Sequence, residues 1–225
     1  ENIAVVLFSG RPLDLRDVQV KAKAILEVWM PGTEGAGAIT DVLYGRYNPT
    51  GKLPMSFPYC VGQVPVHYNE YATGRPHVEG KDKDRFRSKY LDIPNALYPF
   101  GYGLSYTTFT VSEVSLDKDS MKDGESIRAA VTVKNTGTCA GTETIQLYLH
   151  DVAASVVRPV KELKDFRKVT LQPEEEARVE FTITEPQLCF LSENNIFESE
   201  AGIFEIFIGT DSTTTNKAKF TLEKQ

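Results

Sequence analysis

The sequence has few cysteines and histidines and no long apolar run. Three cysteines in 225 residues, with no Cys-x-x-Cys pair, build neither a disulfide framework nor a structural zinc site. Three histidines and the lack of any Gly-x-Ser-x-Gly motif argue against a self-contained hydrolytic triad. No apolar stretch approaches the roughly 18 residues of a membrane span. We therefore expect no metal site and no membrane span.

An excess of positive charge is also missing. The chain has 25 Lys and Arg against 31 Asp and Glu, a net charge of -6, with no long run of one sign. A nucleic-acid binder would carry a basic stripe, so no nucleic-acid partner is expected. The sequence enters an apolar run directly after Glu1-Asn2, without the basic region and cleavage site of a signal peptide. Such a start is typical of a fragment of a longer protein.

Residues 1–60 have the pattern of an α/β domain. Apolar runs at 3–8 and 24–29 are typical of strands buried on both faces, as in parallel sheets. Apolar residues at helical spacing follow from 38 to 43, and Gly45 stands where the glycine after a helix belongs. Two strands and one helix cannot cover both faces of a sheet. This segment is therefore expected to be part of a larger α/β domain or to depend on a partner.

Residues 61–107 are rich in Pro, Gly, Tyr and Asn and lack periodicity, which indicates an ordered interdomain connector. The charged run from 79 to 90 is most simply a solvated loop. Its functional alternative is a rim that hydrogen-bonds a polar ligand such as a sugar, with Tyr71 or Tyr90 as the stacking surface.

From residue 108 to 225 apolar and polar residues alternate with period 2. Turn signals such as Asn135-Thr136-Gly137 separate about seven short strands, which predicts an antiparallel β-sandwich of immunoglobulin or fibronectin type III kind. The aromatic residues Phe181, Phe204 and Phe220 fall in the inward phase, so no exposed aromatic row is expected. The predicted fold class is a partial α/β sandwich segment followed by this all-β domain.

Other chemical patterns in the sequence are weak. Gly32–Gly37 loosely resembles a phosphate cradle but lacks the Lys-Ser/Thr of a P-loop, and close packing at a helix start explains its glycines better. Glu34 and Asp41 have structural explanations, as a helix-start charge and as part of a polar helix face. His67 and His77 flank a loop without a third metal ligand.

Several blocks, in order and spacing, resemble the C-terminal part of glycoside hydrolase family 3, the β-glucosidase and β-xylosidase family. The blocks are Ser9–Leu13, Ala24–Gly35, Ala38–Gly45, Tyr47–Pro54, Thr73–Pro76, Tyr98–Phe109 and Arg158–Phe166. The sequence departs from the family pattern at turn and surface positions, where Asp165 and Glu174 replace usual glycines. These departures bring the turn conformations into question.

The resemblance implies a (β/α)8-type barrel, an α/β sandwich domain and a fibronectin type III-like domain. It implies removal of β-D-glucosyl residues from non-reducing ends with retention, by an aspartate nucleophile on the barrel and a glutamate acid/base upstream of Glu1. We expect no catalytic residue in this chain, no cofactor, and no hydrolysis by this chain alone, since the covalent step needs the nucleophile. The expected partners are the barrel domain and β-glucoside oligosaccharides bound by the intact enzyme.

The family resemblance is to periplasmic or secreted bacterial β-glucosidases, which implies that location. Tyr71 and Arg75 are the candidate substrate-binding residues, at the edge of the sugar site of the intact enzyme. The alternatives are a carbohydrate-binding or protein-interaction β-sandwich module and a structural domain that forms a homodimer. Apolar surface left by absent neighbours predicts association or modest stability of the first half.

Overall fold

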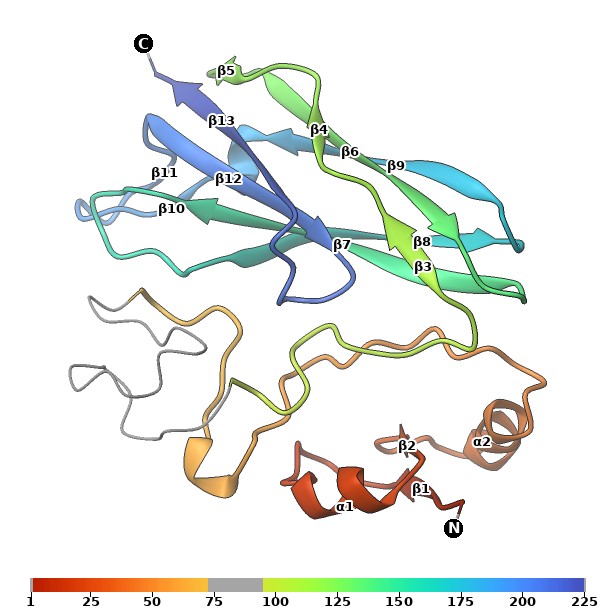
Figure 1. The fold of residues 1–225 in the computed structure, drawn as a ribbon. Coiled ribbons are helices and arrows are strands. Elements are labelled where there is room, and N and C mark those ends of the chain that lie inside the picture. The colour runs from red at the N-terminus through yellow and green to blue at the C-terminus, as the bar shows by residue number, and fades with distance from the viewer. Residues whose placement is uncertain (1, 73–94, 225) are drawn as a thin grey trace, which may run out of the picture. The chain divides into compact units, whose positions relative to one another are not determined.

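The computed structural model describes residues 2–72 and 95–224, which form two compact units (Figure 1). The first unit contains the described residues up to His67 and those from Asn95 to Leu104. The second contains Tyr68–Ala72 and the residues from Ser105 onward. Among these residues no helix has both the length and the apolar character needed to cross a bilayer.

The first unit begins with a small parallel sheet. Strands β1 (Ala4–Leu7) and β2 (Ala24–Glu27) pair in parallel, from Ala4 opposite Ala24 to Leu7 opposite Glu27. A short helix α1 (Arg16–Lys21) connects them, and α2 (Gly35–Leu43) follows. The predicted strands and helix are confirmed, as is the left-handed Gly45 after α2, with φ 73°.

Burial in this sheet differs from the sequence prediction. We expected both strands to be buried on both faces, but every residue of β1 and β2 retains some exposure in the described part of the chain. Apolar side chains beyond the strands are exposed as well, Phe8 by 60% and Met30 by 77%. The reason is that two strands and a helix supply too little cover, as the sequence indicates.

Two distant segments complete the first unit by running antiparallel. The amide of Phe57 donates to the carbonyl of Tyr98 at 2.8 Å, and that of Leu53 donates to the carbonyl of Tyr102 at 2.8 Å. Phe57 is buried, and Tyr98 stacks on Tyr102 with ring centres 5.4 Å apart. The 3-10 helix η1 (Val61–Gln63) follows the first segment. The described residues around Tyr98 and Tyr102 are thus fixed by backbone pairing and ring stacking.

The second unit is a two-sheet β-sandwich (Figure 1). Its strands are β3 (Phe109–Val111), β4 (Ser115–Leu116), β5 (Ser120–Lys122), β6 (Ser126–Asn135), β7 (Gly141–Asp151), β8 (Glu162–Leu171), β9 (Glu176–Thr184), β12 (Gly202–Gly209) and β13 (Lys217–Glu223). One sheet has the order β5-β13-β12-β7-β8, and in the other β6 pairs with β3, β4 and β9. The 3-10 helix η2 (Glu185–Gln187) and the hairpin of β10 (Phe190–Leu191) and β11 (Phe197–Glu198) follow β9. Pairing is antiparallel except between β13 and β5, which are parallel.

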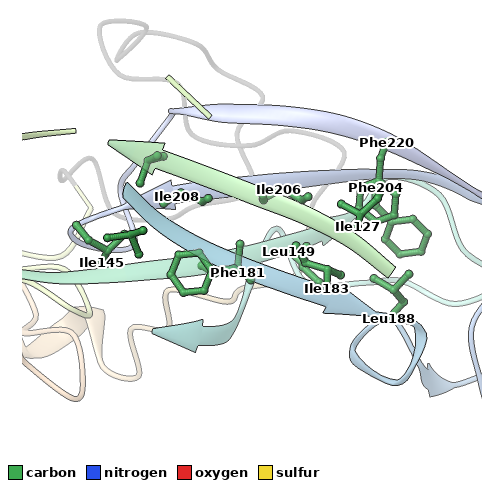
Figure 2. Close-up of a cluster of buried hydrophobic side chains, with 14 of the residues drawn as sticks. Ile127, Ile145, Leu149, Phe181, Ile183, Leu188, Phe204, Ile206, Ile208 and Phe220 are labelled. Carbon is green, nitrogen blue, oxygen red and sulfur yellow. The ribbon is translucent and has the colours of Figure 1, made fainter. Parts of the chain in front are cut away.

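The core lies between the two sheets and follows the predicted alternation. Figure 2 shows side chains of β6, β7, β9, β12 and β13 meeting there. The largest core side chains include Phe181, Phe204 and Phe220, each at most 2% exposed. Phe204 stacks on Phe220 with ring centres 5.4 Å apart. The predicted fold class is therefore confirmed.

The departure from the family pattern at Glu174 has a conformational consequence. Glu174 has φ 63°, in the left-handed region that favours glycine. Its amide donates to the carbonyl of Asn135 at 3.0 Å, and its carboxylate lies 2.7 Å from Lys134. These contacts hold a side-chain-bearing residue in a conformation for which glycine is better suited.

Candidate functional site

The carboxyl ends of β1 and β2 bring three polar or aromatic residues together. Oε1 of Glu27 accepts the amide of Trp29 at 2.8 Å, and Oε2 lies 3.2 Å from the hydroxyl of Ser9. The same hydroxyl lies 2.9 Å from the carbonyl of Arg11. Open parallel sheets bind ligands outside the carboxyl ends of their strands. The strand-end cluster, defined as Ser9, Glu27 and Trp29, is therefore a candidate functional site.

Trp29 is held in an unusual backbone conformation in this cluster. Its φ is 51°, which is a genuine outlier for a bulky residue and costs on the order of 1–3 kcal/mol. The hydrogen bond to Glu27 compensates for part of this cost. The indole is half-buried and packs against Phe57, with ring centres 5.9 Å apart. Strain of this kind is concentrated at functional sites.

The glycine-rich segment at the start of α2 has the structural role predicted for it at one position. A Cβ on Gly35 would lie 2.5 Å from Cβ of Pro31, so the helix start can approach Pro31 only without a side chain. A Cβ on Gly37 would meet nothing within 4 Å. Close packing therefore explains Gly35 and leaves Gly37 unexplained.

The carboxylates near α2 also match their structural explanations. Glu34 occupies the position before the helix and is exposed, with no side-chain capping bond. The carbonyl of Asp41 accepts the amides of Arg46 and Tyr47 at 2.8 and 3.1 Å, and its carboxylate lies 3.6 Å from Arg46. Neither carboxylate belongs to the strand-end cluster.

Tyr71, a predicted substrate-binding residue, lies in a short segment attached to the sandwich. Tyr71 forms an antiparallel bridge with Pro159, and the amide of Val160 donates to the carbonyl of Glu70 at 2.9 Å. Tyr71 is 62% exposed in the described part of the chain. The other predicted residue, Arg75, lies outside the described residues, as do His77 and the charged run from 79 to 90.

Tyr68 anchors the same segment on the outer face of the five-stranded sheet. Its hydroxyl accepts the amide of Leu163 at 3.2 Å, and its ring meets that of Tyr148 edge-on at 5.8 Å. Tyr148 is fully buried and donates its hydroxyl to Oε1 of Gln146 at 2.5 Å. Burial raises the pKa of Tyr148, so its hydroxyl stays protonated and remains a donor. The segment that carries Tyr71 is therefore anchored to a well-packed part of the sandwich.

Lys161 makes a second set of contacts that fix this part of the sandwich. Its ammonium donates to the carbonyls of Ser212 and Thr214 at 3.0 and 2.9 Å and lies 4.3 Å from the ring centre of Phe207. Burial lowers the pKa of Lys161. The family-like block from Arg158 to Phe166 thus contacts the loop between β12 and β13 through Lys161. It contacts Tyr68 through the amide of Leu163.

Within the described ranges no group of three His, Cys, Asp or Glu side chains could hold a metal ion. Nδ1 of His150 lies 3.0 Å from the carbonyl of Pro159, which gives that ring a structural contact. Cys60, Cys139 and Cys189 are free thiols.

The strand-end cluster was not predicted from the sequence, although a signal for it exists. Ser9 directly follows the first apolar run, Glu27 lies within the second, and the only tryptophan of the chain ends the second run two residues after Glu27. Both runs were assigned to strands typical of parallel sheets, and parallel pairing of the two would place these ends together. The left-handed conformation of Trp29 has no such signal, because it depends on the Glu27 side chain.

An α/β unit with parallel strands, followed by a fibronectin type III-like sandwich, defines the class of protein. Residues 1–106 match the glycosyl hydrolase family 3 C-terminal domain, and residues 143–212 match the fibronectin type III-like domain. The chain belongs to glycoside hydrolase family 3 and corresponds to the C-terminal part of its members.

Three relatives agree with this assignment. The periplasmic beta-glucosidase of Salmonella typhimurium is 49% identical over 221 residues, which are 98% of this chain and 29% of that protein. A beta-xylosidase of Formosa agariphila is 40% identical over 93% of this chain and 28% of its own length. The crystal structure of a beta-glucosidase from Listeria innocua in complex with glucose superposes with a TM-score of 0.93 at 43% identity, over 99% of this chain and 31% of that one. The chain thus spans less than a third of these relatives.

Proposed function

We propose that this chain is the accessory C-terminal portion of a β-glucosidase that removes terminal β-D-glucosyl residues with retention. The observation that carries the proposal is the 49% identity with a periplasmic beta-glucosidase over 98% of the chain. Both expected catalytic residues, the aspartate and the glutamate, belong to polypeptide upstream of Glu1. The chain by itself is then inactive, because the covalent step lacks its nucleophile.

The barrel domain is the proposed partner of the first unit. Exposed apolar side chains at the two helices, such as Val20, Leu43 and Tyr44, support a covering neighbour there. A second copy of the chain is the alternative neighbour, and a homodimer would then be found by size-exclusion chromatography with light scattering. By similarity to the Salmonella typhimurium enzyme, the proposed location is periplasmic or secreted.

We propose Tyr71 as a stacking residue at the rim of the sugar site, together with Arg75, which lies outside the described residues. The support for Tyr71 is its 62% exposed side chain on a segment fixed by Tyr68 and Glu70. The alternative of a carbohydrate-binding sandwich is less favoured, since Phe181, Phe204 and Phe220 are buried.

The test is hydrolysis of an aryl β-D-glucoside by the longer protein and by this chain alone. We expect turnover from the first and none from the second, and turnover by this chain alone would contradict the proposal. In the longer protein, Tyr71→Ala should raise KM about threefold to tenfold with a smaller change in kcat, and Tyr71→Phe should keep most of the affinity. The matched control is Tyr106→Ala, another exposed tyrosine of the second unit.

A further inference from the structure

The strand-end cluster has hydrogen-bonding capacity that its internal contacts do not use. The hydroxyl of Ser9 has a single proton and two acceptors within reach, the carbonyl of Arg11 at 2.9 Å and Oε2 of Glu27 at 3.2 Å. When the proton goes to the nearer acceptor, Oε2 of Glu27 receives no donor from any described residue. Each carboxylate oxygen also has two lone pairs, so Oε2 can accept from a ligand in either case.

Trp29, two residues along the chain from Glu27, adds a donor and an apolar surface to the cluster. Its main-chain amide is bound to Glu27, whereas its indole N–H has no hydrogen-bond partner among the described residues. Phe57, 1% exposed, packs against the indole at 5.9 Å between ring centres and limits its movement. The indole is thus held in place before any ligand binds, which lowers the entropic cost of binding.

The residues next to Ser9 and Trp29 in the chain are apolar and exposed. Phe8 and Met30, which follow the two strands, are 60% and 77% exposed. An aromatic face beside a carboxylate acceptor and an indole donor fits a ligand with an apolar ring face and hydroxyl groups around its edge. A pyranose sugar has this combination: its axial C–H groups contact an aromatic ring, and its equatorial hydroxyls both donate and accept.

We propose that the strand-end cluster is a binding site for a pyranose ring, with Trp29 as the stacking surface and Oε2 of Glu27 as the hydroxyl acceptor. Oε1 of Glu27 has a different task, since it holds the left-handed turn that presents the indole. The choice of a sugar rests on the function proposed above. The test measures binding to this chain, so its failure and a failure of hydrolysis by the longer protein are separate results.

Trp29 is the only tryptophan of the chain, and its fluorescence therefore reports on this site alone. We would titrate the 225-residue chain with methyl β-D-glucopyranoside and, as a control, with sorbitol, a polyol of similar size that has no ring. The expected result is a saturable change in Trp29 emission with the glucoside and only a linear solvent effect with sorbitol. A glucoside titration without saturation would overturn the proposal.

Substitutions of Glu27 and Trp29 test whether their side chains bind the sugar. Glu27→Gln keeps an oxygen for the Trp29 amide but puts an NH2 group in place of an acceptor, and it should weaken binding at least tenfold. The matched control Glu34→Gln removes an exposed carboxylate seven residues away and should bind like the parent chain. Trp29→Phe, followed by calorimetry, keeps a ring but loses the indole donor and should also weaken binding. The proposal is wrong if both Glu27→Gln and Trp29→Phe bind like the parent chain, and Trp29→Phe remains informative if Glu27→Gln fails to fold.

Discussion

The hydroxyl of Thr107 donates to Oδ1 of Asn135 at 2.7 Å, and Asn135 is fully buried. The same Oδ1 accepts the amide of Gly137, and Nδ2 donates to the carbonyls of Cys139 and Leu171 at 2.9 and 3.0 Å. One side chain therefore satisfies polar groups from several segments at this end of the sandwich.

The first prediction concerns Asn135→Asp. This change keeps the shape but removes both donors and places a carboxylate against two carbonyls. We expect a loss of about 3 kcal/mol or more in the free energy of unfolding, measured by urea denaturation at pH 7. Asn194→Asp, at an exposed turn position, serves as the control and should change stability by less than about 0.5 kcal/mol. Equal stability of the two variants would contradict this role of Asn135.

The second prediction concerns Lys161→Met. The methionine fills similar space but leaves the carbonyls of Ser212 and Thr214 without their donor. We expect a loss of about 1–3 kcal/mol and faster amide hydrogen exchange in residues 210–214. The control is Lys168→Met on the exposed part of β8. Unchanged exchange in that loop would show that Lys161 does not hold it.

The third prediction concerns pH. Bonds from Lys224, from the hydroxyl of Ser199 and from the amide of Gly124 lower the pKa of Glu185 to about 2. A carboxylate with a depressed folded-state pKa stabilises the fold above its unfolded-state pKa, and this contribution is lost as the pH falls toward the folded-state value.

Denaturation of the parent chain and of Glu185→Gln at several pH values tests this directly. The parent should be the more stable at pH 6, and the difference should shrink progressively below about pH 4.5. Glu193→Gln, which changes an exposed carboxylate of the β10–β11 hairpin, is the control. A difference that stays constant from pH 6 to pH 2 would rule out the ionised carboxylate as its source.

The fourth prediction compares two glycines of α2. In Gly35→Ala the new methyl group would lie 2.5 Å from Cβ of Pro31, so the start of the helix must shift, at a cost of about 1–3 kcal/mol. Gly37→Ala meets no atom within 4 Å and gains helix propensity, so it should be neutral or stabilise by up to about 1 kcal/mol. Thermal unfolding followed by Trp29 fluorescence measures both. Identical melting temperatures would argue against the tight contact at Pro31.

Periodicity predicted the sandwich core well, because alternation with period 2 directly encodes which side chains point inward. The inward positions of Ile127, Phe181 and Ile206 followed from the sequence and are buried. The burial of Tyr148 and Phe207 did not follow, because both lie on the outward phase of their strands. Tyr148 is covered by Tyr68, which is distant in the sequence. Phe207 is covered by Lys161, which directly precedes β8.

The candidate sites were harder to predict for a related reason. Tyr71 could be named from its residue type, but its bridge to Pro159 depends on a long-range pairing without a local signal. The Trp29 turn depends on one side-chain oxygen of Glu27 and on no turn motif. A residue's position in a motif therefore helped to predict its role. A conformation imposed by a single side-chain contact could not be predicted from the sequence.

The passage of the chain between the two units limits how this protein can be dissected. The polypeptide leaves the first unit after His67, contributes Tyr68–Ala72 to the second, returns to the first by Asn95, and leaves it again after Leu104. A truncation that begins at Ser105 would retain every strand of the sandwich yet strip the cover from Tyr148. Neither unit can thus be cloned as one uninterrupted stretch. A single truncation point between the two units' interleaved segments would remove residues from both units.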